Sequence, residues 1–495
     1  MKFIYGKATN KLKRLFKFEI SIATILLILI PNVTYSYPLS SYRIGSIRME
    51  PENYQLLIIS PQKYRSILQH FIEHKEQRNI STKMVTLNEI LEGKYFPING
   101  RDPPEKIKYF IKNAYDEWNI KYVLLFGSIR DIPTCYCWNN DNFSDYPEPY
   151  FISDLYYADI YDSKGDFSSW DTDNDGIYGE WNGRKAEDYN ISLKPEISIG
   201  RLACKSRIEA KTVVKKIIEY ENNKEKEWFK RITLVGGDEL SNITGHYGKK
   251  YRAHEGELLC DKVANIMNDF ENIKLYVSKN NLDPHGINVV KNINKGCGFL
   301  YIPSHGNPMS LATYGDNGSS KITILSTCYS PLLVNQEKLP IAILGGCHSN
   351  QIDVTPFNIL WGLIKEGWKY FHLPTEEDET FGDFWKYEWV PECIGWRLIS
   401  NPHGGAIATI GCTGLGWKGI EINREDGLSD WLEIQFFREY KNGTRILGDI
   451  WRNCITKYLE TFPINWSASS GSVSCLDAKT VEEWILLGDP TLEIG

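Results

Sequence analysis

Residues 299–306 read FLYIPSHG, and residues 341–348 read IAILGGCH. Each stretch is a run of four apolar residues that leads, through small residues, to a reactive side chain: His305 in the first and Cys347 in the second. Short, fully apolar runs between amphipathic helices are typical of parallel strands that are covered on both faces. In open parallel sheets, ligands bind beyond the carboxyl ends of the strands. The two stretches therefore predict an α/β fold with an imidazole and a thiol at one sheet edge.

The same alternation of strand and helix continues on both sides of these stretches. Strands are expected in two series, the first at residues 55–59, 83–87, 122–126 and 197–199, and the second at residues 232–235, 274–277, 299–302, 341–344 and 406–410. The charged stretch 221–227 separates the two series. The sequence thus predicts two tandem doubly wound, mostly parallel sheets flanked by helices. We expect an N-terminal α/β unit at residues 52–228 and a C-terminal, catalytic α/β unit at residues 229–495.

Composition and charge narrow the class of protein. Of the 495 residues, 42% are hydrophobic and 13% aromatic, which is enough for large cores and excludes a disordered chain. The formal net charge of −7 is spread along the sequence and offers nothing to a phosphate backbone, so no nucleic-acid partner is expected. Residues 411–416, GCTGLG, match neither dinucleotide-binding nor Walker spacing. We interpret them as a tight turn and expect no nucleotide.

The N-terminus has the order of a secretory signal. Basic residues between positions 2 and 17 precede an apolar run at residues 20–30 and then Pro31. Eleven apolar residues are too few to span a bilayer comfortably. We predict a signal peptide at residues 1–36, cleaved within residues 32–37, and a secreted or extracellular protein. The alternative is a retained anchor, which would hold the protein at the cell surface and provide its only membrane contact.

The 11 cysteines allow two interpretations. Export makes disulfides feasible, and an odd count leaves at least one thiol without an intrachain partner. In the first interpretation that thiol is Cys347 and some of the others pair. In the second, most are small buried apolar residues, as free cysteines often are.

Three residues after strand ends suit covalent acyl transfer. A thiol such as Cys347 needs a base to become a good nucleophile, and His305 can take its proton and later protonate the leaving amine. Asp238, which follows the strand at residues 232–235, can orient the imidazole. The backbone N–H groups of Gly306 and Cys347 can hold the oxyanion, a contribution of roughly 3–4 kcal/mol.

Each of these residues also has an ordinary structural explanation. A lone histidine after a strand is usually a satisfied surface or core residue, and a cysteine in a glycine-rich turn usually fills space. A metal site of His305, Cys347 and His348 is disfavoured, because adjacent side chains in extended backbone point apart. We therefore expect catalysis without a cofactor.

The ordered set of motifs resembles the caspase–hemoglobinase group of peptidases, and within it the gingipain-type cysteine peptidases. The resemblance begins with His-Gly after one apolar strand and small-x-Cys after the next. Three further stretches are similar to that family: residues 153–159, SDLYYAD; residues 401–408, NPHGGAIA; and residues 484–492, WILLGDPTL. The resemblance covers residues 54–492, nearly the whole chain beyond the predicted signal.

The resemblance implies a two-part catalytic domain and endopeptidase activity on protein or peptide substrates. It implies that His305 is the base, Cys347 the nucleophile and Asp238 an orienting acid. There are departures: Asn350 stands where gingipains have glycine, and residues 251–257 hold no clear match for the acid that selects arginine. Side-chain specificity therefore stays open. A surface transpeptidase that uses the same thiol and a non-catalytic, calcium-stabilised binding module of the same fold are the alternatives.

Residues 171–180, DTDNDGIYGE, form a second motif. Carboxylates at alternating positions, followed by glycine, can wrap a hard cation with oxygen ligands. We predict a structural Ca²⁺ that orders the insertion at residues 135–190. Its ligands are expected to be Asp171, Asp173, Asp175, Ile177 through its carbonyl, and Glu180. The alternative is a solvated acidic turn.

An aromatic run follows the cysteine at roughly helical spacing. It consists of Trp361, Trp368, Tyr370 and Phe371. Such a run is more often core than a substrate platform, so we expect it to be buried.

Overall fold

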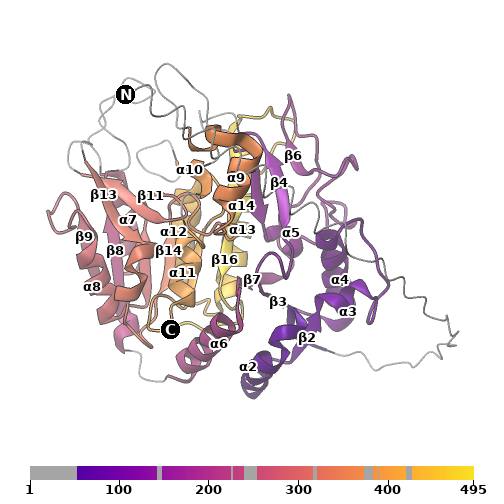
Figure 1. Ribbon diagram of the computed structural model, residues 1–495, viewed down its shortest axis with the longest axis horizontal. Helices are drawn as coiled ribbons and strands as arrows, with labels where there is room; N and C mark the ends of the chain where they lie inside the picture. Colours follow the sequence, from indigo (N-terminus) through magenta and orange to yellow (C-terminus); the bar gives the residue numbers. More distant parts are fainter. Residues whose placement is uncertain are drawn as a thin grey trace, which may run out of the picture. The chain divides into compact units, whose positions relative to one another are not determined.

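The apolar runs of the sequence are the strands of one ten-stranded sheet in a computed structural model of the chain (Figure 1). The structure describes residues 53–141, 148–223, 227–238, 254–315, 320–372, 382, 384–387, 390–419 and 426–495. Residues Pro51–Gly495 form one compact unit. The predicted signal peptide lies outside the described residues, and the predicted boundary at residues 228/229 stays a prediction.

The strand order of the sheet is β2-β1-β3-β7-β16-β15-β14-β10-β8-β9. The bounds of the strands are β1 Leu56–Ser60, β2 Thr82–Thr86, β3 Tyr122–Phe126, β7 Ser198–Leu202, β8 Arg231–Gly236, β9 Glu271–Tyr276, β10 Phe299–Ile302, β14 Ile341–Leu344, β15 Ala408–Cys412 and β16 Trp484–Leu487.

The two predicted strand series form the two halves of this sheet rather than two separate sheets. Within each half the strands are parallel, as the sequence predicts. Strand β16 joins the halves: it runs antiparallel to β15 and parallel to β7, where Leu487 is in register with Arg201. All four residues of β16 are buried, so its apolar run is stable only between two strands. The predicted α/β class and the mostly parallel strands are confirmed. The structure differs from the prediction in that β16 joins the two strand series into a single sheet.

Helices cover both faces of the sheet (Figure 1). Their bounds are α2 Arg65–Gln77, α3 Leu87–Leu91, α4 Pro103–Trp118, α5 Leu155–Ala158, α6 Arg207–Asn222, α7 Glu255–Ile266, α8 Ile287–Lys295, α9 Asn358–Glu366, α10 Phe384–Tyr387, α11 Ile394–Ser400, α12 Leu428–Lys441, α13 Leu447–Thr461 and α14 Val473–Glu483. The 3₁₀ turns are η1 Gln62–Tyr64, η2 Glu227–Lys230, η4 Thr327–Leu332 and η5 Gly367–Phe371.

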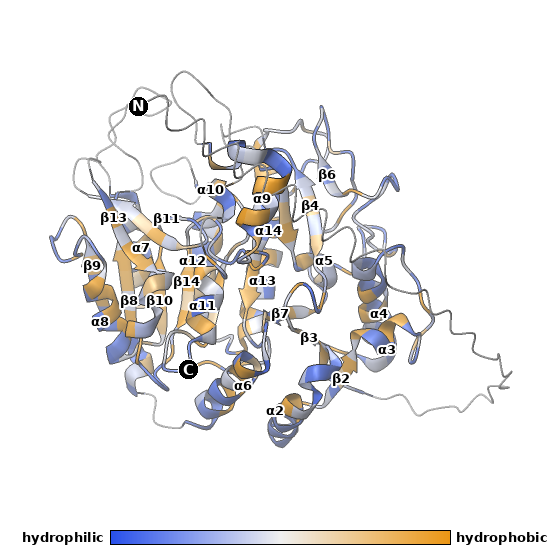
Figure 2. Cartoon of the chain, in the orientation of Figure 1, coloured by the Kyte–Doolittle hydropathy of each residue, from blue (hydrophilic) through white to orange (hydrophobic). Residues whose placement is uncertain are grey.

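Strand β10 shows why these runs lack a polar face. Its side chains alternate between two apolar clusters: Leu300 and Ile302 pack with residues of α8 and α11, and Phe299 and Tyr301 pack with residues of α7 and α12. All four are buried. In Figure 2 the strands β8, β10 and β14 are correspondingly hydrophobic along their length. Truncation of such a side chain to alanine typically costs about 2–5 kcal/mol, so each of them contributes substantially to the stability of the fold.

Two small sheets are added to this framework. One has the order β5-β4-β6, with β4 at Cys135–Asn139, β5 at Tyr150–Ser153 and β6 at Tyr178–Trp181, and belongs to the insertion. The other has the order β11-β12-β13, with β11 at His305–Gly306, β12 at Ser310–Tyr314 and β13 at Lys321–Ser326. The second sheet begins directly after β10 and therefore lies at the carboxyl edge where the sequence places the chemistry.

The cysteines favour one of their two interpretations. All eleven lie in the described residues as free thiols, and nine of them are buried. They therefore act mainly as small apolar residues; Cys328 is exposed and Cys347 is partly buried. Within the described part of the chain, no helix is long and apolar enough to cross a bilayer.

The expectation of a buried aromatic run after the cysteine is wrong for its two tryptophans. Trp361 in α9 is 64% exposed and Trp368 in η5 is 83% exposed, whereas Tyr370 is fully buried. An ideal Cβ on Gly362 would lie 2.1 Å from the Tyr370 ring, so α9 and η5 fold onto each other at this point. Tyr370 fills the contact between α9 and η5, and the two tryptophans lie on the solvent side of these elements.

Candidate active site

His305 and Cys347 occupy equivalent positions beyond neighbouring strands. Strands β10 and β14 are parallel, and their last residues, Ile302 and Leu344, are in register. His305 lies three residues beyond the first and Cys347 three residues beyond the second. Neighbouring strands lie about 4.8 Å apart, so the register brings both residues to one point of the sheet edge.

The backbones of the two segments touch because both carry glycine. An ideal Cβ on Gly306 would lie 2.6 Å from the carbonyl oxygen of Cys347 and 2.7 Å from Cα of Gly346. An ideal Cβ on Gly346 would lie 2.6 Å from a methyl carbon of Leu311. Any larger residue at either position would push the histidine and cysteine segments apart.

A tight hairpin holds His305. It lies in β11, which pairs antiparallel with β12, and His305 is in register with Ala312. The connecting turn is fixed by Asn307, whose Oδ1 accepts from the backbone N–H of Met309 at 2.9 Å and of Ser310 at 2.7 Å. The Tyr314 ring lies edge-on to the imidazole, with ring centroids 5.5 Å apart. The sequence therefore positions this exposed imidazole through local turn chemistry and one aromatic contact.

The backbone of Asp238 pairs with Tyr314, the last residue of β12. Its backbone N–H donates to the Tyr314 carbonyl at 3.3 Å, and the Tyr314 N–H donates to the Asp238 carbonyl at 2.8 Å. Asp238 is buried. Tyr314 therefore links two of the three residues singled out from the sequence: its ring contacts the His305 ring, and its backbone pairs with that of Asp238.

The Cys347 thiol faces a turn that follows β15. Its Sγ donates to the carbonyl oxygen of Gly416 at 3.6 Å. Burial, and next the charge of Glu483, raises the pKa of the thiol to about 11. At neutral pH the resting sulfur is therefore protonated, and a base must remove its proton during attack.

His348 is adjacent in sequence but is not part of this arrangement. Its Nδ1 forms a hydrogen bond with Oε1 of Gln351 at 2.9 Å, and its Nε2 lies 3.4 Å from Oε2 of Glu148. Burial lowers its pKa to about 3, so it stays neutral in the physiological range. A base must accept a proton near neutrality, which makes His348 a poor candidate.

Sequence reasoning missed the turn that lies against the thiol. Besides the Gly416 carbonyl, the Gly414 carbonyl accepts the backbone N–H of His348 at 2.9 Å. Cys412, at the end of β15, and Glu483, at the end of α14, lie against this same turn. One signal pointed there: β15 follows β14 in a parallel series, so the residues after it must emerge at the same edge.

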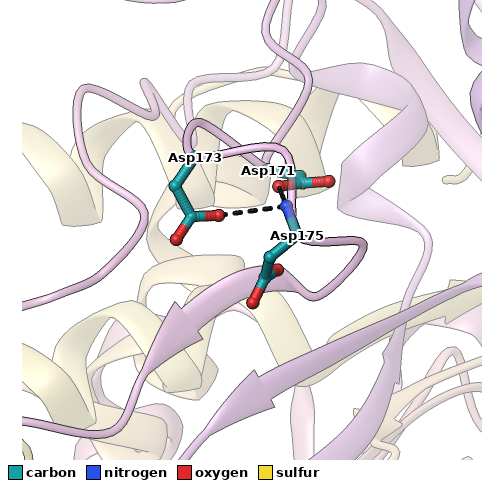
Figure 3. Close-up of side chains that lie close together, drawn as sticks. All are labelled: Asp171, Asp173 and Asp175. Atoms are coloured by element: carbon teal, nitrogen blue, oxygen red, sulfur yellow. Dashed lines mark hydrogen bonds between the residues drawn. The ribbon is translucent and has the colours of Figure 1, made fainter.

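The acidic motif of the insertion gathers three carboxylates (Figure 3). One oxygen from each of Asp171, Asp173 and Asp175 lies within 4.8 Å of the others. The backbone N–H of Asp175 donates to Oδ1 of Asp171 at 3.0 Å and to Oδ1 of Asp173 at 3.2 Å, which curls the loop. Asp171 is buried, and the other two are exposed. The loop thus presents oxygen atoms at one point, as a calcium site requires.

The two remaining predicted ligands, Ile177 and Glu180, lie outside this group of three carboxylates. The backbone N–H of Ile177 donates to Oδ1 of Asp175 at 2.8 Å. Burial, followed by the charge of Asp175, raises the pKa of Glu180 to about 7. Asp188, which the sequence motif does not include, accepts from the backbone N–H of Glu180 at 2.9 Å. The guanidinium of Arg101 forms an ion pair with Asp171.

A cavity of the protein lies away from the candidate catalytic residues. A cavity of about 1340 Å³ lies at the amino ends of the second strand series, the edge opposite to His305 and Cys347. It is lined by Arg78, Glu221, Asn223, Glu227, Trp228, Arg231, Lys295, Lys338, Glu493 and Gly495.

Comparison with known proteins identifies the family of the chain. The profile described as "Peptidase family C25" matches residues 49–495. Gingipain R2 of Porphyromonas gingivalis is 23% identical over 305 residues, which are 60% of this chain and 32% of the relative. Gingipain R1 of the same organism is 22% identical over 305 residues, 60% of this chain and 24% of the relative. The chain thus spans about a third or less of the length of these curated relatives.

Solved structures show the same fold. The Arg specific cysteine proteinase gingipain R (RGPB) superposes with a TM-score of 0.55 at 18% identity, covering 90% of this chain and 79% of that one. The complex of P. gingivalis RgpB pro- and mature domains gives a TM-score of 0.54 at 18% identity, covering 89% and 79%. The resemblance to the gingipain-type group is confirmed at the level of sequence family and of fold.

Proposed function

Because the chain belongs to peptidase family C25, we propose that it is a secreted cysteine endopeptidase with Cys347 as nucleophile and His305 as general base. The observation that carries the proposal is the register of β10 with β14, which brings the two residues to one point of the sheet edge. Family membership supports the reaction class, and protein or peptide chains are the proposed substrates. The side chain before the cleaved bond is left open.

The proposed reaction begins with the protonated thiol. Rotation about χ1 takes the Cys347 sulfur from the Gly416 carbonyl toward the substrate, and His305 removes its proton as the sulfur attacks the carbonyl carbon. The oxyanion is held by the N–H groups of Gly306 and Cys347. The imidazolium then protonates the leaving amine, and a thioester remains on Cys347. Water, deprotonated by His305, cleaves the thioester and releases the acid. Asp238 is proposed to orient the imidazole.

Product analysis tests the proposal. The full chain is incubated with a peptide library in the presence of an amine acceptor, and the products are identified by mass. Hydrolysis gives new amino termini and free carboxyl termini, whereas a transpeptidase joins the acceptor to the new carboxyl end. A protein that leaves the library intact is the non-catalytic binding module.

The close approach of the two glycine segments gives a prediction of its own. Gly306→Ala is expected to lower kcat/KM by at least about 10²-fold, because a displacement of about 1 Å at a reacting centre has this effect. The new Cβ has no space beside the Cys347 carbonyl, so the histidine segment must move. Kinetics are compared with the melting temperature of the variant. Full activity in a folded Gly306→Ala protein would contradict the proposed pairing of the two segments.

Export is proposed from the N-terminal sequence alone. Amino-terminal sequencing of protein recovered from the medium is expected to start within residues 33–38. Recovery of the uncleaved chain with membranes would support the retained anchor instead.

We further propose that the insertion binds a structural Ca²⁺ through Asp171, Asp173, Asp175, the Ile177 carbonyl and Glu180. The three aspartates fit the ion, since one oxygen from each lies within 4.8 Å of the others and two of the three side chains are exposed. A bound ion would relieve the repulsion among the loop carboxylates and would hold the insertion in one conformation.

Chelation is expected to lower the melting temperature of the protein. An ion at 100 times its dissociation constant stabilises the folded state by about 2.7 kcal/mol. The pKa of Glu180 is raised to about 7, so without an ion the fold loses stability as this carboxyl ionises between about pH 4.5 and pH 7. Calcium binds the ionised form, so the melting difference between calcium and EGTA should grow from pH 5.5 to pH 8.

The double change Asp173→Asn with Asp175→Asn should remove the calcium effect, and Glu117→Gln, an exposed acid on α4, should preserve it. Equal melting temperatures with calcium and EGTA at pH 8 would leave the loop a solvated acidic turn.

A further inference from the structure

A second thiol lies beside the proposed nucleophile. The Sγ atom of Cys412 lies 3.4 Å from the carbonyl oxygen of Gly346 and 3.4 Å from that of Gly414. The Sγ atom of Cys347 lies 3.6 Å from the carbonyl oxygen of Gly416. Both sulfurs therefore lie between the same two backbone segments, residues 346–347 and residues 414–416.

The separation of the two sulfurs is bounded by this geometry. A carbonyl oxygen and Sγ of the next residue are at most about 6 Å apart by covalent geometry. Because Cys412 Sγ is 3.4 Å from the Gly346 oxygen, the two sulfurs lie within about 9 Å. Leu344 and Gly411, on adjacent strands, are in register close to the two cysteines. The two thiols also interact electrostatically, because the charge of Cys347 contributes to the raised pKa of Cys412.

A buried carboxylate lies against both thiols. Glu483 is fully buried, and neither of its oxygens has a hydrogen-bond partner among the residues that the structure describes. An ideal Cβ on Gly416 would lie 3.1 Å from Cys412 Sγ and 3.4 Å from Oε1 of Glu483. After burial, the charge of Glu483 is the largest contribution that raises the pKa of each thiol. A buried carboxyl group without a hydrogen bond is costly. Burial raises the pKa of Glu483 to about 8, so this carboxyl group can exchange a proton with a neighbouring thiol near neutral pH.

We propose that Cys347 and Cys412 form a reversible disulfide when Cys347 is oxidised by a peroxide, with Glu483 accepting the Cys412 proton. The proposal rests on the proposed function, in which Cys347 is the reactive thiol. Cys347 is also the more exposed of the two thiols, so it is the one that reacts with peroxide first.

The chemistry balances in two steps. In the first, the Cys347 sulfur attacks a peroxide oxygen, the O–O bond breaks, and Cys347 sulfenic acid and water are formed. In the second, the Cys412 sulfur attacks the sulfenic sulfur and the S–O bond breaks. The leaving hydroxide takes the proton of the Glu483 carboxyl group and departs as water, and the Cys412 proton passes to Glu483 in its place. Peroxide is reduced, and the two thiols are oxidised to one disulfide.

The consequence is a protected resting state. A nucleophilic thiol in an oxidising compartment otherwise proceeds to sulfinic and sulfonic acids, which thiols do not reverse. The disulfide stops this sequence at a state that dithiothreitol restores. Peptidase activity is off while the bond is intact, because the Cys347 sulfur is consumed in it.

Peptide mapping of the oxidised full chain tests the proposal. Reduced protein is treated with hydrogen peroxide, its remaining thiols are blocked with N-ethylmaleimide, and it is digested without reductant. We expect a cross-linked peptide containing Cys347 and Cys412, together with loss of peptidase activity and its recovery in dithiothreitol. Absence of that peptide from the oxidised wild-type protein overturns the proposal.

Three variants sharpen the test. Cys412→Ser keeps a donor for the Gly346 carbonyl, and it should lose both the cross-link and the recoverable fraction of activity, with Cys347 found as sulfinic or sulfonic acid. Cys454→Ser, at a buried thiol of α13, should behave as wild type. Glu483→Gln should slow cross-link formation, and an unchanged rate would remove Glu483 from the account. Wild-type recovery in Cys412→Ser would contradict the disulfide.

The mapping also separates this proposal from the proposed function. A cross-link in a protein that hydrolyses no peptide would support the disulfide and contradict the peptidase. An active peptidase without the cross-link would support the proposed function and contradict the disulfide.

Discussion

Replacement of Cys347 with alanine is expected to reduce kcat/KM for peptide hydrolysis by about 10⁴- to 10⁶-fold, the loss typical of a deleted nucleophile. The change removes one sulfur and its hydrogen bond to the Gly416 carbonyl. A hydrogen bond of this kind contributes about 1 kcal/mol or less, so the fold should persist. Hydrolysis is measured with the peptide found in the library experiment, and folding is measured by thermal melting.

Cys328→Ala is the matched control for this change. Cys328 is a free thiol in η4 and is exposed, so its loss should leave kcat/KM and the melting temperature unchanged. A folded Cys347→Ala protein that keeps even a tenth of wild-type activity would place the nucleophile elsewhere.

Replacement of His305 with glutamine is expected to lower kcat/KM by about 10²- to 10⁴-fold, the usual contribution of a general base. The reason is the state of the thiol: with a pKa raised to about 11, it holds its proton at neutral pH until a base removes it. Since a protonated imidazole accepts no proton, wild-type activity should fall on the acid side of neutrality, and this acid limb should vanish in His305→Gln.

His348→Gln decides between the two histidines near the thiol. The imidazole of His348 is buried and forms a hydrogen bond with the side chain of Gln351, and burial lowers its pKa to about 3. Its replacement should lower the melting temperature while the acid limb persists. If the limb disappears in His348→Gln and remains in His305→Gln, the assignment of the base is wrong. His70→Ala, on the exposed side of α2, serves as the unaffected control.

Much of the site was predictable because it depends on local sequence and on one rule of parallel sheets. The apolar runs at residues 299–302 and 341–344 specify strands that are buried on both faces, and parallel strands end at a common edge. The alternation of elements was likewise sufficient for two strand series and for most of their helices. Family resemblance added the roles of the residues but not their surroundings.

What the sequence could not provide depends on long-range packing. Strand β16 is a four-residue apolar run, and nothing local to Trp484–Leu487 says that it joins two halves of a sheet. The position of Glu483 follows from β16, since the residue before that strand is carried to the edge where Cys347 lies. The exposure of Trp361 and Trp368 was mispredicted because helical spacing identifies an apolar face without saying whether another element covers it.

The proposed mechanism requires that Cys347 reacts with substrate carbonyls because His305 removes its proton. Its most direct test is covalent labelling with a peptide-derived electrophile, followed by digestion and a comparison of the labelling rates of Cys347 and the exposed Cys328. In the wild-type protein we predict that the label goes to Cys347, and that His305→Gln slows this reaction by at least about tenfold while the Cys328 rate stays constant. Labelling of Cys347 at the same rate in both proteins, or inactivation with Cys347 unmodified, would rule out this mechanism.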